Sequence, residues 1–450
     1  MKLPLAKQMR AAGDLVRDRV PVVDGFIDFL NKPLPRNVGW LQTLGSLLAF
    51  YIVLQTVTGI LLAFYYSNSA ETAFQSIGYI RGELRLGALL LALHRYGAGF
   101  IIVTAFLHFT RVYFSAAYRK PREFVWITGL LLGVLLTLFA FTGQLLPYDQ
   151  HGYWATVVGI RIAASAPGLE APLQDVLTGG FGSIGTTTLS RFYVLHIAVL
   201  PLVFFALMGL HFKLLQKAGS AGPLEGSPDP KHSFYPSQLL KDLLVSTVGA
   251  LALFLMAWFV PATEYGPASS QAGNFVPRPE WFFYAHYELL KLLPSNMQVL
   301  GTFVLPNVLL GLLLALPFLD RGQDRRFSAR RLQVTLGALL VVGILVLTTK
   351  GFLEASAEAS KREAQSQGQE SIADGPTLFE KKGCVKCHTI QGHGGDKGPD
   401  LSHVARRLKP GYFKPWIRRP QDLDPNTEMP SFEGSEEELS VLVNYLRTLK

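Results

Sequence analysis

The chain has 450 residues, of which 49% are hydrophobic and 17% charged, and its formal net charge at neutral pH is +9. This composition is too apolar for an ordinary soluble protein and predicts several membrane spans. The positive charge gathers in alternate loops, which favours a membrane orientation over nucleic-acid binding as the reason for the basic balance.

The N-terminal segment, residues 1–38, mixes charged and apolar residues and lacks the uninterrupted apolar core of a signal peptide. Its apolar residues recur on one helical face between Leu15 and Leu30. This pattern predicts an amphipathic helix that lies on the membrane surface.

Seven apolar stretches are long enough to cross a bilayer as helices. We predict spans at about Leu41–Tyr65, Leu86–Phe114, Phe124–Leu146, Phe192–Leu215, Leu243–Pro261, Val299–Leu319 and Leu332–Phe352. Lys and Arg concentrate in the N-terminal segment and in the loops after the second, fourth and sixth spans, so these regions are predicted to be cytoplasmic. An odd number of spans then places the C-terminal residues on the opposite, periplasmic side.

Two pairs of histidines lie in these spans. His94 and His108 are 14 positions apart, and His196 and His211 are 15 apart. At 1.5 Å per residue, each pair is separated by about 21–22 Å along a helix, which is too far for one metal ion. Ionisable side chains inside a bilayer are costly and mark functional sites. The matched spacing predicts two haems stacked across the membrane, each bound by one histidine from each span.

The first and third spans carry glycines at a spacing similar to that of the histidines. Gly45 and Gly59 are 14 positions apart, as are Gly129 and Gly143. A haem pressed against a helix leaves no room for a side chain, and glycine permits that approach. Small-residue packing between membrane helices is the alternative explanation. With the histidines, the glycines favour a four-helix bundle with two haem slots over residues 39–220.

Two arginines lie beside the histidines of the second span. Arg95 follows His94, and Arg111 comes three residues after His108. Both are candidates for pairing with haem propionates. Each could instead be an interfacial arginine whose head group reaches the membrane surface.

The C-terminal region differs from the rest of the chain. Residues 354–374 are rich in Ala, Ser, Glu, Gln and Lys, which predicts a hydrophilic linker that can be partly helical. A small soluble domain follows over 375–450 and contains Cys384-Val-Lys-Cys387-His388, the attachment signature of c-type haem. The motif predicts that the two thiols form thioethers to the haem and that His388 is its proximal ligand. No other cysteine remains for a disulfide framework.

Met429, which lies 41 positions after His388, is the predicted second axial ligand of this haem. The alternative is a core methionine. His393 and His403 are expected to be surface groups. Because haem c is attached only after export, the domain is predicted to face the periplasm, in agreement with the charge pattern.

A short acidic motif, Pro279-Glu280-Trp281, opens an aromatic stretch on the predicted periplasmic side. A carboxylate in apolar surroundings can take a proton from a bound hydroxyl. Alone, a three-residue motif has low specificity.

Together these residues resemble the cytochrome b family of cytochrome bc complexes, the quinol:cytochrome c or plastocyanin oxidoreductases, over roughly residues 20–350. The resemblance is carried by the histidine and glycine pairs, Lys120-Pro121-Arg122-Glu123, Pro147-Tyr148-Asp149-Gln150-His151-Gly152-Tyr153-Trp154, Ser190-Arg191-Phe192-Tyr193-Val194-Leu195-His196 and the Pro-Glu-Trp motif. The longer second histidine spacing is similar to that of the branch found in photosynthetic membranes and Gram-positive bacteria, which usually splits the protein after the fourth span. The C-terminal domain resembles class I cytochromes c fused after the last span.

The resemblance implies an all-α protein with seven membrane helices, arranged as a four-helix di-haem bundle (39–220) and a three-span part (221–353), plus the cytochrome c domain. It implies two non-covalent haems b, one near the periplasm on His94 and His196 and one near the cytoplasm on His108 and His211. Glu280 would be the proton acceptor for quinol, with Tyr153 as a second catalytic residue. Pro279, Trp281, Tyr153 and Trp154 would line the quinol site.

The implied reaction is bifurcated quinol oxidation. One electron goes to a Rieske iron–sulfur protein and then to haem c and a soluble or membrane cytochrome c or terminal oxidase. The other goes to the two b haems, with protons released on the periplasmic side. The implied assembly is a homodimer in the bacterial cytoplasmic membrane.

Three positions depart from the relatives. The photosynthetic branch attaches an extra haem through a cysteine where this chain has Thr43, so no covalent extra haem is expected. The same branch has an arginine where this chain has Gln216, which puts the cytoplasmic quinone site in doubt. Phe282 follows the Pro-Glu-Trp motif where many relatives have Tyr, so a hydroxyl is not required there.

The rival hypothesis is a non-catalytic di-haem membrane anchor that passes electrons to another subunit, with the cytochrome c domain as a wire. It would need the histidines and the Cys384–His388 motif but not Glu280. A haem-based sensor has no output domain to support it. The roles of His151, His232 and His286 stay open. For His151, close to the predicted quinol site, a proton relay and a structural role are both considered.

Overall fold

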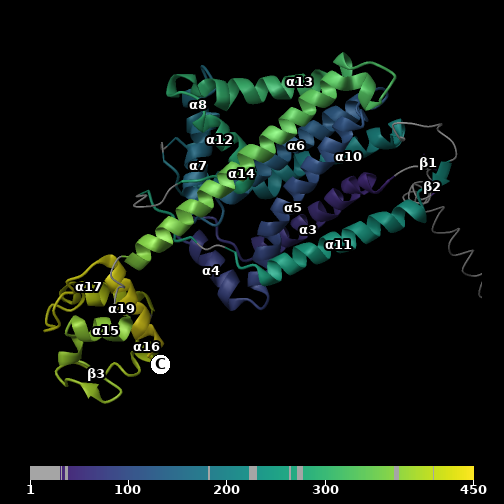
Figure 1. Cartoon of the computed structure of the whole chain (residues 1–450). Helices are drawn as coiled ribbons and strands as arrows, with labels where there is room; N and C mark the ends of the chain where they lie inside the picture. The colour runs from purple at the N-terminus through teal and green to yellow at the C-terminus, as the bar shows by residue number, and fades with distance from the viewer. Residues whose placement is uncertain are drawn as a thin grey trace, which may run out of the picture. The chain divides into compact units, whose positions relative to one another are not determined.

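The structure is a computed structural model of the chain. It describes residues 31, 33–35, 39–180, 183–221, 231–262, 265–270, 277–368, 374–408 and 410–449. The surface helix predicted near the N-terminus lies outside the described residues. The chain divides into two compact units, Met1–Phe352 and Leu353–Lys450. Both are built almost entirely from helices (Figure 1), as the predicted all-α class requires.

Among the described residues, seven helical segments are long and apolar enough to cross a membrane, which confirms the predicted number of spans. They are η1 (Trp40–Thr43) with α3 (Leu44–Ala63); α5 (Gly87–Phe114); α6 (Glu123–Gln144); α9 (Thr186–Val194), η2 (Leu195–Val199) and α10 (Leu200–Ala218); α11 (Ser237–Phe259); η4 (Ser295–Met297), η5 (Leu300–Val304) and α13 (Leu305–Leu319); and η6 (Phe327–Arg330) with α14 (Arg331–Gly368).

Three of these helices extend beyond the apolar stretch that marked them. The fourth begins at Thr186 and the fifth at Ser237, each about six residues before the predicted start. The last, α14, continues to Gly368 and covers most of the predicted 354–374 linker. Hydropathy marks only the part of a helix that suits lipid, whereas Ala, Glu, Lys and Gln also favour helix where the chain is polar.

The first four spans and the fifth pack side by side. Helix α3 packs on α5, α6 on α10, and α11 on both α3 and α5. Their shared core contains Tyr51, Ile52, Ile101, Phe204 and Leu253. Many apolar side chains outside this core are exposed, such as Leu202 at 75%. Such an outer surface is what a bundle needs when its surroundings are hydrocarbon.

In their described parts, the loops between spans contain four short α-helices that we did not predict. They are α4 (Ala73–Glu83), α7 (Gln150–Ala163), α8 (Glu170–Thr178) and α12 (Tyr284–Lys291). Helix α7 begins where the Asp149 carboxylate accepts a hydrogen bond from the Gly152 N–H at 2.7 Å. A short strand pair also joins β1 (Pro33–Pro35) and β2 (Lys231–Ser233).

At the end of the bundle that carries the α5–α6 loop, a buried carboxylate joins the first four spans to the last two. Arg119 and Arg330 form ion pairs with Asp320, and the Tyr118 hydroxyl donates to the same carboxylate at 2.5 Å. Burial alone would raise the pKa of Asp320, but the hydrogen bonds from Arg119 and Tyr118 and the two positive charges outweigh it and lower that pKa.

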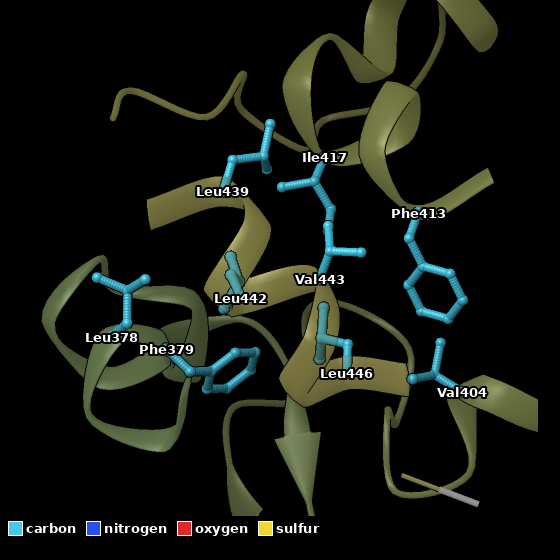
Figure 2. Packing of buried hydrophobic residues seen from close by; sticks show 9 residues of the cluster. All are labelled: Leu378, Phe379, Val404, Phe413, Ile417, Leu439, Leu442, Val443 and Leu446. Carbon is cyan, nitrogen blue, oxygen red and sulfur yellow. The ribbon is translucent and has the colours of Figure 1, made fainter. Parts of the chain in front are cut away.

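The C-terminal unit has its own hydrophobic core. Its elements after α14 are α15 (Gly375–Lys381), η7 (Cys384–Lys386), β3 (Thr389–Ile390), β4 (His393–Gly394), α16 (Val404–Arg407), η8 (Pro410–Tyr412), α17 (Phe413–Arg418), α18 (Pro420–Leu423) and α19 (Glu436–Thr448). Figure 2 shows Leu439, Leu442 and Leu446 of α19 packed among residues from the other helices, including Phe379 and Phe413. A capping box between Ser435 and Glu438 starts α19.

Candidate functional site

The four membrane histidines lie on two helical segments. His94 and His108 are on α5, His196 is in η2 and His211 is on α10. The rings of His94 and His196 have centroids 6.5 Å apart at an interplanar angle of 75°. His108 and His211 lie further along the same two helices and are electrostatic neighbours. The structure therefore brings the histidines together as the two predicted pairs.

The unequal spacings, 14 and 15, are explained by the local helix geometry. His196 sits in the π-helical segment η2, which is followed by α10 without a break. A π turn takes in one more residue than an α turn. The extra residue between His196 and His211 is therefore absorbed at η2.

The four glycines lie against the histidine rings, a contact that we did not predict. A Cβ atom added at each glycine would meet Cε1 of one imidazole: at 3.0 Å for Gly59 on His94, 2.7 Å for Gly143 on His196, 3.3 Å for Gly45 on His108 and 3.3 Å for Gly129 on His211. Real Cβ atoms essentially never approach closer than 3.0 Å. Glycine at these positions gives each ring the room to lie beside the neighbouring helix.

Three histidines also contact a threonine that directly precedes a glycine. The Oγ1–Nδ1 distances are 2.9 Å for Thr58 and His94, 3.1 Å for Thr142 and His196, and 2.9 Å for Thr128 and His211. Each hydroxyl also donates to the carbonyl four residues earlier, at 2.8 to 2.9 Å. A hydroxyl has one proton, so the imidazole Nδ1–H must be the donor in the contact with histidine. The lone pair is then on Nε2, ready for a metal.

His108 is the exception. The residue before Gly45 is Leu44, which has no hydroxyl. The Nδ1 atom of His108 is buried and has no hydrogen-bond partner among the described residues. The threonines and this exception were missed from the sequence, although the Thr-Gly dipeptides at three of the four glycines were a visible signal.

These pairs fit a haem better than a bare metal ion. Protein sites for bare ions need three or four ligands, and no group of three or more His, Cys, Asp or Glu in the described part of the chain could hold one. Haem iron already has four porphyrin ligands and needs only two axial ones. Two imidazoles with free Nε2 atoms meet that need. Each ring lies in a glycine notch, by which we mean the space that the missing side chain of Gly45, Gly59, Gly129 or Gly143 leaves on the neighbouring helix.

The two predicted propionate partners have different surroundings. Arg111 interacts electrostatically with Arg122 and Arg325, so three guanidinium groups lie near the end of the bundle that carries His108. Such a cluster suits carboxylates and favours the propionate alternative for Arg111. Arg95 is an electrostatic neighbour of the Asp149 carboxylate, at the other end of the histidine pairs.

The Pro-Glu-Trp segment lies against the start of α7. Nδ1 of His151 is 3.8 Å from a carboxylate oxygen of Glu280, and the two side chains are 11% and 25% exposed. The pKa of the neighbouring Asp149 is raised, mainly by burial. The Gly152 N–H and the charges of His151 and Arg95 lower this pKa, and the negative charge of Glu280 raises it further. Two carboxyl groups and one imidazole therefore share this site.

The predicted walls of the quinol site have identifiable contacts. Tyr153 is buried in a cluster with Tyr148 and Phe192, and Trp154 packs on that cluster. The buried indole N–H of Trp154 has no hydrogen-bond partner in the part of the chain that the structure describes, and is available to donate to a ligand. Trp281 stacks on Phe352 of α14, with ring centroids 6.1 Å apart. Pro279 directly precedes Glu280.

A second buried carboxylate, which we did not predict, supports this segment. Glu288 of α12 is fully buried, with the Lys291 ammonium at 2.5 Å and the Lys350 ammonium of α14 at 3.0 Å. Tyr284 of α12 packs against Gly351 and Phe352. The segment after Glu280 is thus held to the last span by both charge and packing.

The C-terminal unit carries the predicted haem c residues. The His388 Nδ1 lies 2.9 Å from the Pro399 carbonyl, an acceptor that leaves Nε2 free for iron. Cys384 and Met429 both pack on the hydrophobic core, and burial raises the pKa of the Cys384 thiol. Cys384 and Cys387 form no disulfide with each other. This arrangement fits a covalently attached haem.

Comparisons with known families agree along the chain. Residues 29–219 match the family described as cytochrome b/b6/petB, and residues 276–362 match cytochrome b (C-terminal)/b6/petD. Residues 372–450 match cytochrome c.

Individual relatives give the same result. The chain is 32% identical to the cytochrome bc complex cytochrome b subunit of Chlorobaculum thiosulfatiphilum over 345 residues, which is 74% of this chain and 78% of the relative. It is 32% identical to cytochrome b of Mycosarcoma maydis over 67% of this chain and 77% of the relative. A solved hyperthermophilic respiratory Complex III chain aligns with a TM-score of 0.68 and 29% identity, covering 75% of this chain and 91% of that chain.

Proposed function

The chain belongs to the cytochrome b family of cytochrome bc complexes, the quinol:cytochrome c oxidoreductases, and from this we propose that it oxidises quinol by a bifurcated reaction coupled to proton translocation. It is a multi-pass membrane protein, and its cytochrome b and cytochrome c regions imply haem b and haem c. The observation that carries the proposal is that the histidine rings form two layers, His94 with His196 and His108 with His211, each ring beside a glycine notch. Both layers belong to the same unit as the Pro-Glu-Trp segment.

We propose that the membrane unit binds two haems b and the C-terminal unit one covalent haem c. His94 with His196 and His108 with His211 would be the axial ligands in the membrane. Cys384 and Cys387 would hold haem c, with His388 and Met429 as its axial ligands. When bound, these haems supply the path by which electrons leave the quinol.

The quinol chemistry rests on side chains at the Pro-Glu-Trp segment. The Glu280 carboxylate would accept a proton from the quinol hydroxyl, a transfer that requires hydrogen-bond reach between the two oxygens. Pro279, Trp281, Tyr153 and Trp154 would enclose the ring. A Rieske iron–sulfur protein would take the first electron.

The proposed topology and assembly follow the charge pattern and the family. The N-terminus would be cytoplasmic and the cytochrome c unit periplasmic, in a bacterial cytoplasmic membrane. The working assembly would be a homodimer that delivers electrons to a cytochrome c or a terminal oxidase. The domain organisation would be a surface helix at 1–38, the di-haem bundle at 39–220, the three-span part at 221–353, a linker at 354–374 and the cytochrome c domain at 375–450.

Oxidant-induced reduction tests the proposal. Membranes that hold the complex are poised with quinol, the cytoplasmic quinone site is blocked, and b-haem absorbance is followed after a pulse of oxidant. Bifurcation predicts that the b haems become more reduced while haem c is oxidised. The Glu280→Gln variant should lose this effect and keep both b haems. If the b haems instead follow haem c into oxidation, the chain is a linear electron wire, as the rival anchor hypothesis predicts.

A further inference from the structure

His151 is a titratable side chain at the quinol site that the proposed reaction does not use. It lies in the first turn of α7, one residue before the glycine whose N–H binds the Asp149 cap. The ring is nearly buried, and its plane stacks on Tyr265 at 15° with centroids 4.8 Å apart. The stacking fixes the direction of the imidazole edge.

That edge meets Glu280. Nδ1 of His151 is 3.8 Å from Oε1 of Glu280, which is longer than a direct hydrogen bond. A small rotation of the Glu280 side chain, or one bridging water, brings the two groups into contact. Imidazole is the side chain best suited to exchange protons near neutral pH.

The charged surroundings of the ring are also defined. Asp149 lies on the same turn, with Arg95 of α5 facing that carboxylate. Glu280 faces the ring from the segment before α12, and Tyr265 covers its face from the segment after α11. The charged neighbours of the ring are therefore the carboxylates of Glu280 and Asp149, the latter faced by Arg95.

We propose that His151 is the proton relay of Glu280, which accepts the quinol proton from Glu280 and passes it on to water. This inference rests on the proposed quinol site. In the first step a quinol O–H bond breaks and a carboxyl O–H bond forms on Glu280. In the second, that O–H bond breaks, an N–H bond forms at Nδ1, and the carboxylate is restored. The imidazolium then releases its Nε2 proton to water, and proton exchange with water returns the ring from the Nδ1–H form to the Nε2–H form before the next turnover.

The relay requires a specific neutral form of the ring. Nδ1 must be unprotonated to accept, so Nε2 carries the hydrogen in the resting state. Protonating the ring beforehand blocks the second step. Quinol oxidation should therefore slow as the pH falls, and this acid limb should disappear when the imidazole is replaced.

The test compares variants of the complete complex in membranes. His151→Gln keeps a polar group of similar reach but cannot carry a proton. We expect quinol-dependent haem c reduction to slow at least tenfold at neutral pH, with the acid limb of the pH profile lost and the haem b to haem c ratio unchanged. His151→Asn should behave in the same way.

His286→Gln is the matched control. This histidine is a partly buried residue of α12 whose Nε2 lies 2.9 Å from the Gly301 carbonyl, and its replacement should leave the acid limb in place. Asp149→Asn tests the other nearby acceptor. If Asp149→Asn removes the acid limb while His151→Gln keeps it, the relay runs through Asp149 and the proposal for His151 is overturned.

The failure of the relay can be told from the failure of the quinol site. Wild-type complex must first show oxidant-induced reduction of the b haems; without it, the proposed function itself fails. If the wild type shows the effect and His151→Gln retains wild-type rates across the pH range, only the relay is wrong.

Discussion

The two histidine layers of the bundle are similar in design but differ in detail. In the His94/His196 layer both rings donate from Nδ1 to a threonine. The glycine notches are tight, because an added Cβ would lie only 3.0 Å from Cε1 of His94 and 2.7 Å from Cε1 of His196. In the His108/His211 layer only His211 has a threonine partner. An added Cβ at either glycine would lie 3.3 Å from Cε1 of the ring beside it. The His94/His196 layer is tightly held, and both of its rings are hydrogen-bonded. The His108/His211 layer is looser, and its His108 ring has no hydrogen-bond partner among the described residues.

This difference would give the two proposed haems b different properties on one scaffold. An acceptor on Nδ1–H makes an imidazole more basic, and a more basic ligand favours ferric iron. The layer with the unpaired His108 should therefore hold the haem of higher potential. Electrons that enter at the His94/His196 layer would then move toward the other layer spontaneously.

The largest expected effect comes from filling the tightest notch. In Gly143→Ala the new methyl group would lie 2.7 Å from the His196 ring, so the ring must leave its position. We expect loss of the haem in that layer alone. The haem b to haem c ratio, measured by pyridine haemochrome spectra, should fall from 2:1 to 1:1, with haem c as the internal reference.

The matched control is Gly45→Ala in the looser layer. A gap of 3.3 Å requires a shift of only a few tenths of an ångström, so this variant should keep both b haems. Equal haem loss in Gly143→Ala and Gly45→Ala would show that the two layers do not differ in tightness.

The next largest effect is the loss of stability expected when the buried carboxylate of Asp320, near the His108/His211 layer, is replaced. Arg330 binds Asp320 and also donates to the Phe114 carbonyl, six residues after His108. Asp320→Asn leaves two buried guanidinium groups without their counter-charge and should destabilise the membrane unit by about 3–5 kcal/mol. Thermal unfolding in detergent would measure the loss. Asp324→Asn, at an exposed carboxylate of the same loop, is the control and should change stability little.

This effect should depend on pH. The pKa of Asp320 is lowered in the folded protein. Its contribution is therefore present above the unfolded pKa of about 3.9 and lost as the pH falls through the lower folded value. The stability difference between wild type and Asp320→Asn should narrow in acid. A difference that stays constant down to pH 3 would contradict a charged Asp320 in the folded state.

The smallest effect sharpens the comparison between the layers directly. Leu44→Thr supplies the missing acceptor for His108 and should lower the potential of the His108/His211 haem by about 40 mV, the equivalent of one hydrogen bond of about 1 kcal/mol. Thr58→Val removes an acceptor from His94 and should raise the other potential by a similar amount. Redox titrations of the two b haems would record both shifts. Shifts of the wrong sign would exclude this tuning mechanism.

Much of the molecule was predictable from the sequence because the signals are local. The seven spans depend on runs of apolar residues, and the Cys384–His388 motif is contiguous. The spacing of the histidines predicted two haems between the same two helices, since helix rise converts sequence distance into position, and the family resemblance supplied the pairing. The short helices α4, α7, α8 and α12 were missed because their apolar patterns are too brief to separate from loop sequence.

Other features were decided only by the tertiary structure, because they join residues far apart in the chain. The spacing of 15 predicted the second pair, but only the fold shows that the π turn at His196 takes up the extra residue. Thr58 reaches His94 across 36 positions, and Asp320 reaches Arg119 across 201. His151 meets Glu280 because the α6–α7 loop and the Pro-Glu-Trp segment come together. Residue type and spacing therefore determine which chemistry the chain can perform, and packing decides which side chains assist it.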